Sequence, residues 1–224
     1  MSTIALQALG LETSHLVDYQ DRLVHNQIVN DLDALNKAVK AAGFEFTIAS
    51  AHRDFHRQAS IWNAKFSGKR SILDKNSIPI DTDSLTDSEI VESIMLFSAL
   101  PGASRHHFGS DLDIYAKNCL APHESLQLEP WEYQSGGPFY EFSCWLESSL
   151  SEFGFFKPYD KYRGGVAAEP WHISHIKTAN MMTKCVTPNT IRDAIAKQNI
   201  LGKAAILAEL PRLYTQYVTN IAKN

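Results

Sequence analysis

The most informative segment of this chain is residues 104–115, Ser-Arg-His-His-Phe-Gly-Ser-Asp-Leu-Asp-Ile-Tyr. The second half of the stretch alternates acidic and apolar residues, which predicts a short strand over 111–115 with its apolar side chains toward the core. Asp111 and Asp113 then share the opposite face of that strand. Gly109 permits a sharp turn just before it, so that the imidazole seven residues ahead of Asp113 can point into the same cleft.

Helices and short strands surround this stretch in mixed order, which favours an α+β fold over a doubly wound parallel sheet. Apolar spacing predicts helices over 19–43, 54–69, 86–100 and 139–152, strands over 44–48 and 171–176, a surface loop over 70–83, and a fully helical segment after Pro188 that only Pro211 interrupts. We find no internal repeat, low-complexity tract or Gly/Ser linker. We therefore expect one domain over 1–224, with 188–224 as a helical C-terminal extension packed on it.

Composition excludes several classes of function. The 224 residues are 44% apolar and carry a formal charge of −4, without a basic block, so nucleic-acid binding is disfavoured. Residues 1–15 lack the pattern of a secretory signal, and no apolar stretch approaches the length of a membrane span. Three cysteines without a CxxC spacing fit a reducing compartment. We expect a cytoplasmic protein with neither a nucleic-acid partner nor a membrane span, and the sequence leaves its oligomeric state open.

Polar side chains able to bind a metal concentrate in two segments, 104–113 and 169–175. Together these segments supply His106, Asp113 and His172 as three nitrogen and oxygen ligands, with Glu169 unassigned. Three such ligands with a fourth position left for water are typical of a catalytic zinc site, and a nearby carboxylate can accept the proton of that water.

Spacing alone leaves alternatives open. His107 and His175 lie beside the candidate ligands, and either imidazole can take the place of its neighbour. Asp111 is as well placed on its strand as Asp113. A purely structural cluster without any metal is the further alternative.

Read together, the segments resemble the D-alanyl-D-alanine carboxypeptidase/dipeptidase family of zinc peptidases, the VanY and VanX type, also called M15 peptidases. The family signatures S-x-H-x-x-G-x-A-x-D and E-x-W-H are matched, with all spacings kept, by Ser104, His106, Gly109 and Asp113 and by Glu169, Trp171 and His172. A third element of the family, S-G-Y-R, is similar to Ser50-Ala51-His52-Arg53, which Gln58 follows. The resemblance covers roughly residues 44 to 180.

The resemblance implies a role for each matching residue. His106, Asp113 and His172 would bind one Zn²⁺, and Glu169 would act as general base and then general acid. Arg53 would hold or polarise the substrate, because its planar fork matches a carboxylate or a developing oxyanion. The remaining positions would line or support the site, with Trp171 as a packing residue; they are Ser104, Gln58, Asp111 and Trp171.

The implied activity is that of a zinc D,D-carboxypeptidase, which hydrolyses the terminal D-Ala-D-Ala bond of peptidoglycan stem peptides or precursors by metal-activated water. A D-Ala-D-Ala dipeptidase and an L-Ala-D-Glu endopeptidase of the same family remain alternatives, because the motifs do not separate them. A non-catalytic zinc-binding recognition module is a third, since the Hedgehog signalling domain resembles this fold. With a cytoplasmic location, the expected substrates are dipeptides, precursors or recycled muropeptides, unless the protein reaches the cell wall by another route.

Two positions depart from the family pattern. Asp111 replaces the small residue of the first signature, which places a second acid beside the metal and affects the choice of metal or the rejection of an acidic substrate. His52 replaces an aromatic residue of the third element, so we expect a more polar wall next to Arg53. Neither change removes a catalytic group.

Overall fold

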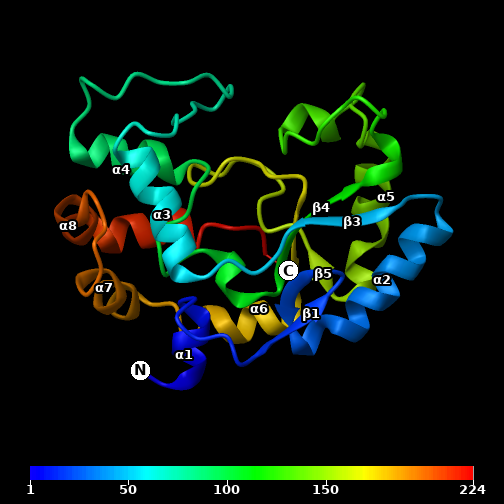
Figure 1. Cartoon of the computed structure of the whole chain (residues 1–224), viewed down its shortest axis with the longest axis horizontal. Helices are drawn as coiled ribbons and strands as arrows, with labels where there is room; N and C mark the ends of the chain where they lie inside the picture. The colour runs from blue at the N-terminus through cyan, green and yellow to red at the C-terminus, as the bar shows by residue number, and fades with distance from the viewer. Residues whose placement is uncertain (224) are drawn as a thin grey trace.

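The computed structural model describes residues 1–223, and a four-stranded antiparallel sheet lies at its centre (Figure 1). The strand order is β3-β4-β6-β5, and the bounds are Phe46–Ser50 for β3, Asp111–Ala116 for β4, Phe155–Phe156 for β5 and His172–His175 for β6. Every neighbouring pair is antiparallel. The predicted α+β class with a small antiparallel sheet flanked by helices is confirmed.

One face of the sheet packs against α2 (Val29–Ala41) and α5 (Tyr140–Ser149) (Figure 1). The period of two along β4 turns Leu112 and Ile114 toward these helices, and both are fully buried. Their partners in this hydrophobic core include Leu32, Leu35, Ile48, Phe142, Leu146 and Ile173. The acidic residues of β4 are left on the other face, as the alternation in the sequence predicts.

A second hydrophobic core lies among the helices on the opposite side of the molecule. These helices are α1 (Thr3–Ala8), α3 (Phe55–Phe66), α4 (Asp87–Met95), α6 (Ile176–Thr183), α7 (Pro188–Ala196) and α8 (Lys203–Leu213). Trp62 is the largest side chain buried in this core, and its indole N–H donates to the Leu201 carbonyl oxygen at 3.0 Å. The polar face of the sheet carries Asp113 and His172, which line a cavity together with Met95 and Leu100 of the helical core.

The helix predicted over 19–43 is wrong in its first third. A hairpin, β1 (Leu16–Tyr19) and β2 (Arg22–His25), occupies that stretch, and a 3₁₀ turn over Asn26–Ile28 leads into α2. The two-residue turn places Gln20 and Asp21 at φ 51° and 60°, a left-handed conformation that closes a hairpin and cannot continue a helix. Leu23, assigned to the buried side of a helix, is 49% exposed on β2.

Other predicted elements are present with shifted ends. The strand predicted over 44–48 is β3, which begins two residues later, and the helix predicted to end at residue 100 stops at Met95. Asp54 caps α3 by accepting from the Arg57 N–H at 2.7 Å, and Thr86 and Glu89 form a capping box at α4. The segment over 139–152 divides into α5 and a 3₁₀ turn at Leu150–Phe153. Further 3₁₀ turns are Arg105–Phe108, Lys117–Cys119 and Pro130–Tyr133.

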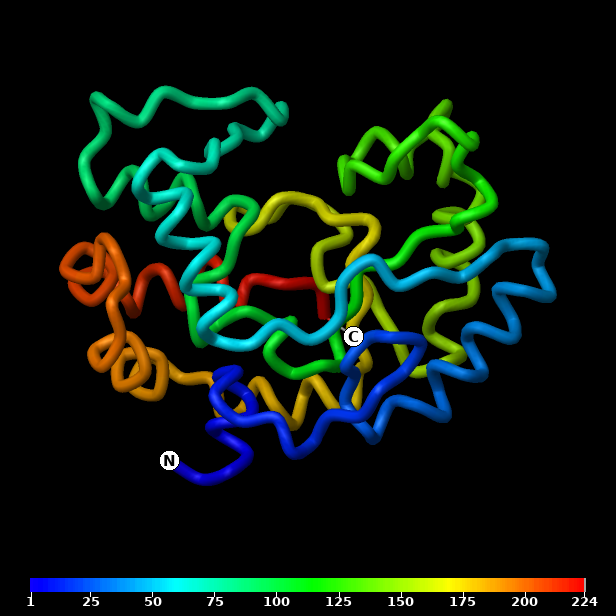
Figure 2. The backbone as a smooth tube through the Cα atoms, viewed as in Figure 1, coloured from blue at the N-terminus to red at the C-terminus, as the bar shows by residue number. Residues whose placement is uncertain are grey.

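The C-terminal segment breaks at a position other than the predicted one. Pro211 lies inside α8, whereas the helical path is interrupted over residues 197–202, between α7 and α8. Gly202 closes this break with a φ of 68°, where a Cβ would collide with the Phe66 ring. A π-helical turn, Tyr214–Val218, follows α8, and the chain then runs back toward the middle of the molecule (red in Figure 2). No helix among residues 1–223 is both long and apolar enough to cross a bilayer.

Candidate active site

The 3₁₀ turn Arg105–Phe108 positions the first imidazole of the site. His106 Nδ1 donates to the Ala51 carbonyl oxygen at 2.9 Å, because a carbonyl can only accept. In a neutral ring this hydrogen bond places the lone pair on Nε2, and Nε2 lies 3.3 Å from Asp113 Oδ2. The orientation of a metal-binding histidine is commonly fixed in this way by its second ring nitrogen.

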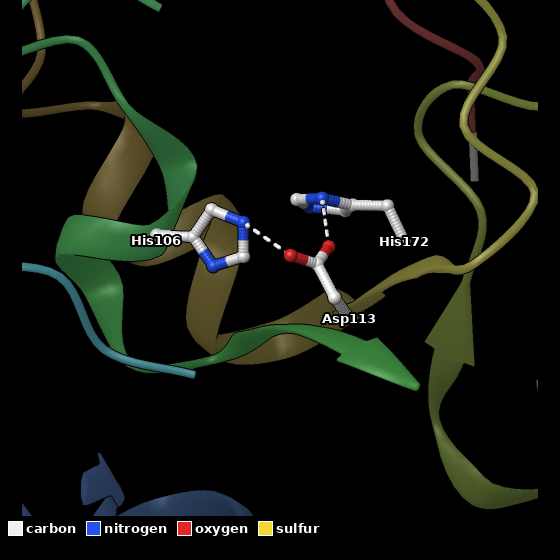
Figure 3. Close-up of side chains that lie close together, drawn as sticks. All are labelled: His106, Asp113 and His172. Atoms are coloured by element: carbon white, nitrogen blue, oxygen red, sulfur yellow. Dashed lines mark ion pairs between the residues drawn. The ribbon is translucent and has the colours of Figure 1, made fainter. Parts of the chain in front are cut away.

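Sheet register brings the other two residues together. Asp113 on β4 is directly opposite His172 on β6, so the two side chains leave the same face of the sheet as neighbours. His172 Nδ1 lies 3.2 Å from Asp113 Oδ1 without hydrogen-bond geometry, and both atoms are buried without a hydrogen-bond partner. Figure 3 shows the carboxylate of Asp113 between the two imidazoles.

These three residues suit a metal ion. One ligand atom from each of His106, Asp113 and His172 lies within 4.8 Å of the others, and within residues 1–223 no other group of three such side chains meets this condition. Two nitrogens and one oxygen are a donor set that zinc accepts, with a fourth position left for water. Buried polar atoms normally have hydrogen-bond partners, and a bound ion would provide one for Asp113 Oδ1 and for His172 Nδ1.

His107 and His175, which lie near the candidate ligands in the sequence, make contacts elsewhere. His107 Nδ1 donates to the Arg53 carbonyl oxygen at 2.6 Å, and its Nε2 accepts from the Gly102 N–H. His175 packs on the far side of β6, where its Nε2 lies 3.0 Å from Asp31 Oδ2. Neither residue belongs to the group of three, so tertiary structure removes both alternatives.

Asp111 lies behind His172 rather than within the ligand group. Its Oδ1 accepts from His172 Nε2 at 3.1 Å, on the side of the ring opposite Asp113. The same oxygen accepts from Arg105 Nε at 2.6 Å, and Arg105 also donates to Ser174 Oγ at 2.6 Å. The carboxylate therefore orients the imidazole, and its charge is paired with that of a buried guanidinium.

Glu169 sits at the edge of the group on the loop that precedes β6. Its Oε2 lies 3.5 Å from His172 Nδ1, and its backbone N–H donates to the Tyr159 carbonyl oxygen at 2.9 Å. Burial raises the pKa of Glu169 to about 7; Asp113 adds to the rise, whereas His172 and Arg53 oppose it. A carboxyl group with a pKa near neutrality can both accept and return a proton.

Arg53 lies in the segment between β3 and α3, and the side chains that accept its hydrogen bonds are uncharged. Its guanidinium donates to Gln58 Oε1 at 2.9 Å and to Ser50 Oγ at 3.4 Å, and Gln58 in turn donates to the Ala99 carbonyl oxygen. No ion pair within residues 1–223 includes Arg53. Its charge is therefore available to a substrate.

A cavity of about 320 Å³ connects these groups. Arg53, Ser104, Trp171 and Glu169 line it together with the three candidate ligands. Trp171 is 6% exposed and also packs against the Tyr133 ring, so it closes the inner wall.

Sequence reasoning missed several residues of the cavity wall, namely Lys65, Arg70, Tyr159 and Tyr217. For Lys65 a signal was present. It follows Gln58 by seven residues, two helical turns, so both side chains lie on the same face of α3. The other three come from loops and from the C-terminal turn, where periodicity gives no indication.

Comparison with known proteins places this site in a family. An uncharacterized protein of Haemophilus influenzae is 36% identical over 121 residues, which cover 53% of this chain and 92% of that protein. Solved structures with a similar fold are VanYB in complex with D-alanine-D-alanine and a variant of the D,D-pentapeptidase VanY in complex with Zn(II). They are 20% and 22% identical, each with a TM-score of 0.52, and they cover 82% and 85% of this chain and 89% and 88% of their own.

The LD-carboxypeptidase LdcB is 19% identical with a TM-score of 0.54, over 87% of this chain and 89% of its own. The family model for VanY, D-alanyl-D-alanine carboxypeptidase, matches residues 21–178, which include the three candidate ligands, Arg53 and Glu169. The match spans well over half of the chain. This protein therefore belongs to the VanY family of D-alanyl-D-alanine carboxypeptidases, a metallopeptidase family whose members are peptidoglycan peptidases.

Proposed function

We propose that the protein is a zinc-dependent D,D-carboxypeptidase that removes the C-terminal D-alanine from peptidoglycan stem peptides or their precursors. The observation that carries the proposal is the meeting of His106, Asp113 and His172 with Glu169 and Arg53 in one cavity. Family membership supports the reaction, and the neighbours that hold Zn(II) and D-alanine-D-alanine support the metal and the substrate.

The chain would hold the ion through His106 Nε2, one oxygen of Asp113 and His172 Nδ1. A bound Zn²⁺ supplies Lewis acidity, which lowers the pKa of a water molecule and polarises a carbonyl oxygen. Asp111 keeps the proton of His172 on Nε2, so that Nδ1 faces the other two ligands with its lone pair.

Glu169 moves the proton in this scheme. Its carboxylate takes a proton from the attacking water while the water oxygen bonds to the scissile carbonyl carbon. The same proton then passes to the amide nitrogen, the carbon–nitrogen bond breaks, and D-alanine leaves as the amine. Burial supports both steps, because it holds the pKa of this group at about 7.

Arg53 binds and orients the substrate. Two neutral partners, Gln58 and Ser50, fix its guanidinium without cancelling the positive charge. The fork can then donate hydrogen bonds to the oxygen on which negative charge develops.

The first test measures release of D-alanine from a pentapeptide stem precursor and from free D-Ala-D-Ala. The zinc-loaded wild type is compared with the Glu169→Gln variant, whose amide keeps the size of the side chain but cannot accept the proton. We expect roughly a 10²- to 10⁴-fold loss of kcat in the variant, with stoichiometric zinc retained. Glu152→Gln, a change on the surface, serves as the matched control and should leave kcat unchanged.

The substrate panel separates the alternatives. Release from free D-Ala-D-Ala alone would make the protein a dipeptidase, and cleavage only of L-Ala-D-Glu bonds would make it an endopeptidase. Zinc binding with no hydrolysis of any of these peptides would identify a recognition module. Wild-type turnover in the Glu169→Gln variant would overturn the assignment of the base.

A further inference from the structure

Lys65 is a buried cation without a carboxylate partner. It lies near the end of α3 and is 7% exposed, and its Nζ donates to Ser98 Oγ at 2.8 Å. None of the ion pairs within residues 1–223 includes it. Lysine is almost never buried in this way unless its charge is paired, because removal of an ammonium from water costs several kcal/mol.

The other well-buried lysine of the chain shows the usual solution. Lys157 has a side chain only 8% exposed, and its Nζ lies 3.3 Å from Glu147 Oε1 and donates to Ser143 Oγ. Lys157 does not line the cavity of the candidate active site. Lys65, inside the cavity, thus differs from Lys157, outside it, because no carboxylate pairs with its ammonium group.

The position of Lys65 in the cavity indicates which kind of anion could pair with it. Its side chain lines the same cavity of about 320 Å³ as the candidate metal ligands and Glu169, and the cations Arg53 and Arg70 line that cavity too. Burial, together with the nearby charge of Arg70, lowers the pKa of Lys65 to about 8, whereas Glu169 acts in the opposite direction. An anionic group of a bound molecule would therefore stabilise the ammonium.

We propose that Lys65 binds the free C-terminal carboxylate of the peptide substrate and so selects for cleavage at a chain end. The inference rests on the proposed function and deepens it. A carboxypeptidase must place the leaving residue inside its cavity, and the α-carboxylate of that residue is the one anion that every such substrate carries next to the scissile bond. An endopeptidase has no such group at that position.

Two cations then serve two different groups. Arg53 contacts Gln58 at the beginning of α3, and Lys65 lies about 10 Å farther along the helix axis on the same face. Both side chains line the same cavity, and in the proposed complex the scissile carbonyl binds to Arg53 and the carboxylate of the leaving residue to Lys65. Ser98 keeps the ammonium pointed into the cavity, because Lys65 Nζ donates to it.

The test compares a peptide ending in D-Ala-D-Ala as the free acid with the same peptide as the C-terminal amide. For the zinc-loaded wild type we expect kcat/KM for the acid to exceed that for the amide by roughly 10- to 100-fold, the range expected for a charge-assisted hydrogen bond. In K65M the acid should lose that advantage, while kcat/KM for the amide stays within about threefold of wild type, as expected if only the carboxylate contact is lost. K65R should restore part of the preference.

Two controls separate loss of the carboxylate contact from a general effect of removing a buried lysine. Lys157→Met removes a buried lysine outside the cavity and should leave the ratio of acid to amide unchanged. K65M should unfold at a temperature equal to or above that of wild type, because it removes an unpaired buried charge. If K65M does not fold, K65Q is used in the same comparison of acid and amide.

An equal loss on acid and amide, or a wild type that hydrolyses both equally well, would overturn the role of Lys65 and leave the peptidase proposal standing. A wild type that hydrolyses neither peptide would instead contradict the proposed function.

Discussion

At the scale of single residues, the hydrogen bonds of His172 decide which of its nitrogens can bind a metal. Asp111 holds Nε2, so Nδ1 is directed to Asp113. The small residue of the family signature can make no such contact. At this departure from the pattern the carboxylate supports the imidazole, and Asp111 is not one of the three residues whose ligand atoms lie together.

Asp111→Asn should weaken zinc binding. The amide holds His172 Nε2 less firmly than a carboxylate, and we expect zinc affinity to fall roughly 10- to 100-fold in a competition with a chelator. Ser174→Ala is the matched control, because it removes the other side-chain partner of Arg105 and leaves the contact between Asp111 and His172 intact. An unchanged affinity in Asp111→Asn would show that the imidazole needs no support from this side.

At the scale of elements, the C-terminal segment supports the loop that carries the candidate base. Gln216 donates to the Gly164 carbonyl oxygen at 2.8 Å, and Asn220 donates to the Arg163 carbonyl oxygen at 2.8 Å. Gly165 fits tightly beneath the segment, since a Cβ there would lie 2.0 Å from the Gln216 carbonyl oxygen. Gln216 and Asn220 lie outside the range 21–178 that the family model matches, whereas the loop they contact lies inside it.

The double variant Gln216→Ala/Asn220→Ala should loosen that loop. We expect faster amide hydrogen exchange over residues 163–169 and a fall in kcat/KM, with a loss of about 1–2 kcal/mol in the free energy of unfolding for two partly exposed hydrogen bonds. Thr215→Ala provides the control, because the Thr215 hydroxyl bonds only within its own helix. Exchange rates equal to wild type in the loop would contradict this supporting role.

At the scale of the whole molecule, the site joins segments that belong to different parts of the fold. His106 lies on a 3₁₀ turn whose neighbours Ala103 and Phe108 belong to the core among the helices, whereas Asp113 and His172 lie on two strands of the sheet. An ion bound by all three therefore ties the two halves of the structure together, and its binding energy adds to the stability of the native state.

Removal of zinc should lower the melting temperature. At free zinc one hundred times above its dissociation constant the stabilisation is about 2.7 kcal/mol, which corresponds to roughly 5–11 °C in a chain of this length. Calorimetry with and without chelator measures the shift. His106→Ala should melt at the same temperature in both conditions, and a shift that persists in this variant would place the stabilising ion elsewhere.

The sequence predicted more of the site than of the boundaries between elements. Ser104 to Asp113 and Glu169 to His172 are contiguous motifs, so their spacing carries the information on which side chains converge. The predicted helix over 19–43 overlaps the hairpin at residues 16–25, because Leu23 and Ile28 match a helical period while the turn at Gln20 and Asp21 has no glycine to mark it. Local sequence patterns predict the ends of helices and strands poorly.

The fold class, the family and the residues that meet at the centre could be predicted from the chain alone, because alternation and motif spacing are local properties. Tertiary structure alone decided that Asp111 supports His172 from behind, that Lys65 is a buried cation without an anion, and that the C-terminal segment holds the loop of Glu169. Each of these facts depends on contacts between residues far apart in the chain. The helical period places Lys65 on the same face as Gln58, but no local pattern shows whether its charge has a partner.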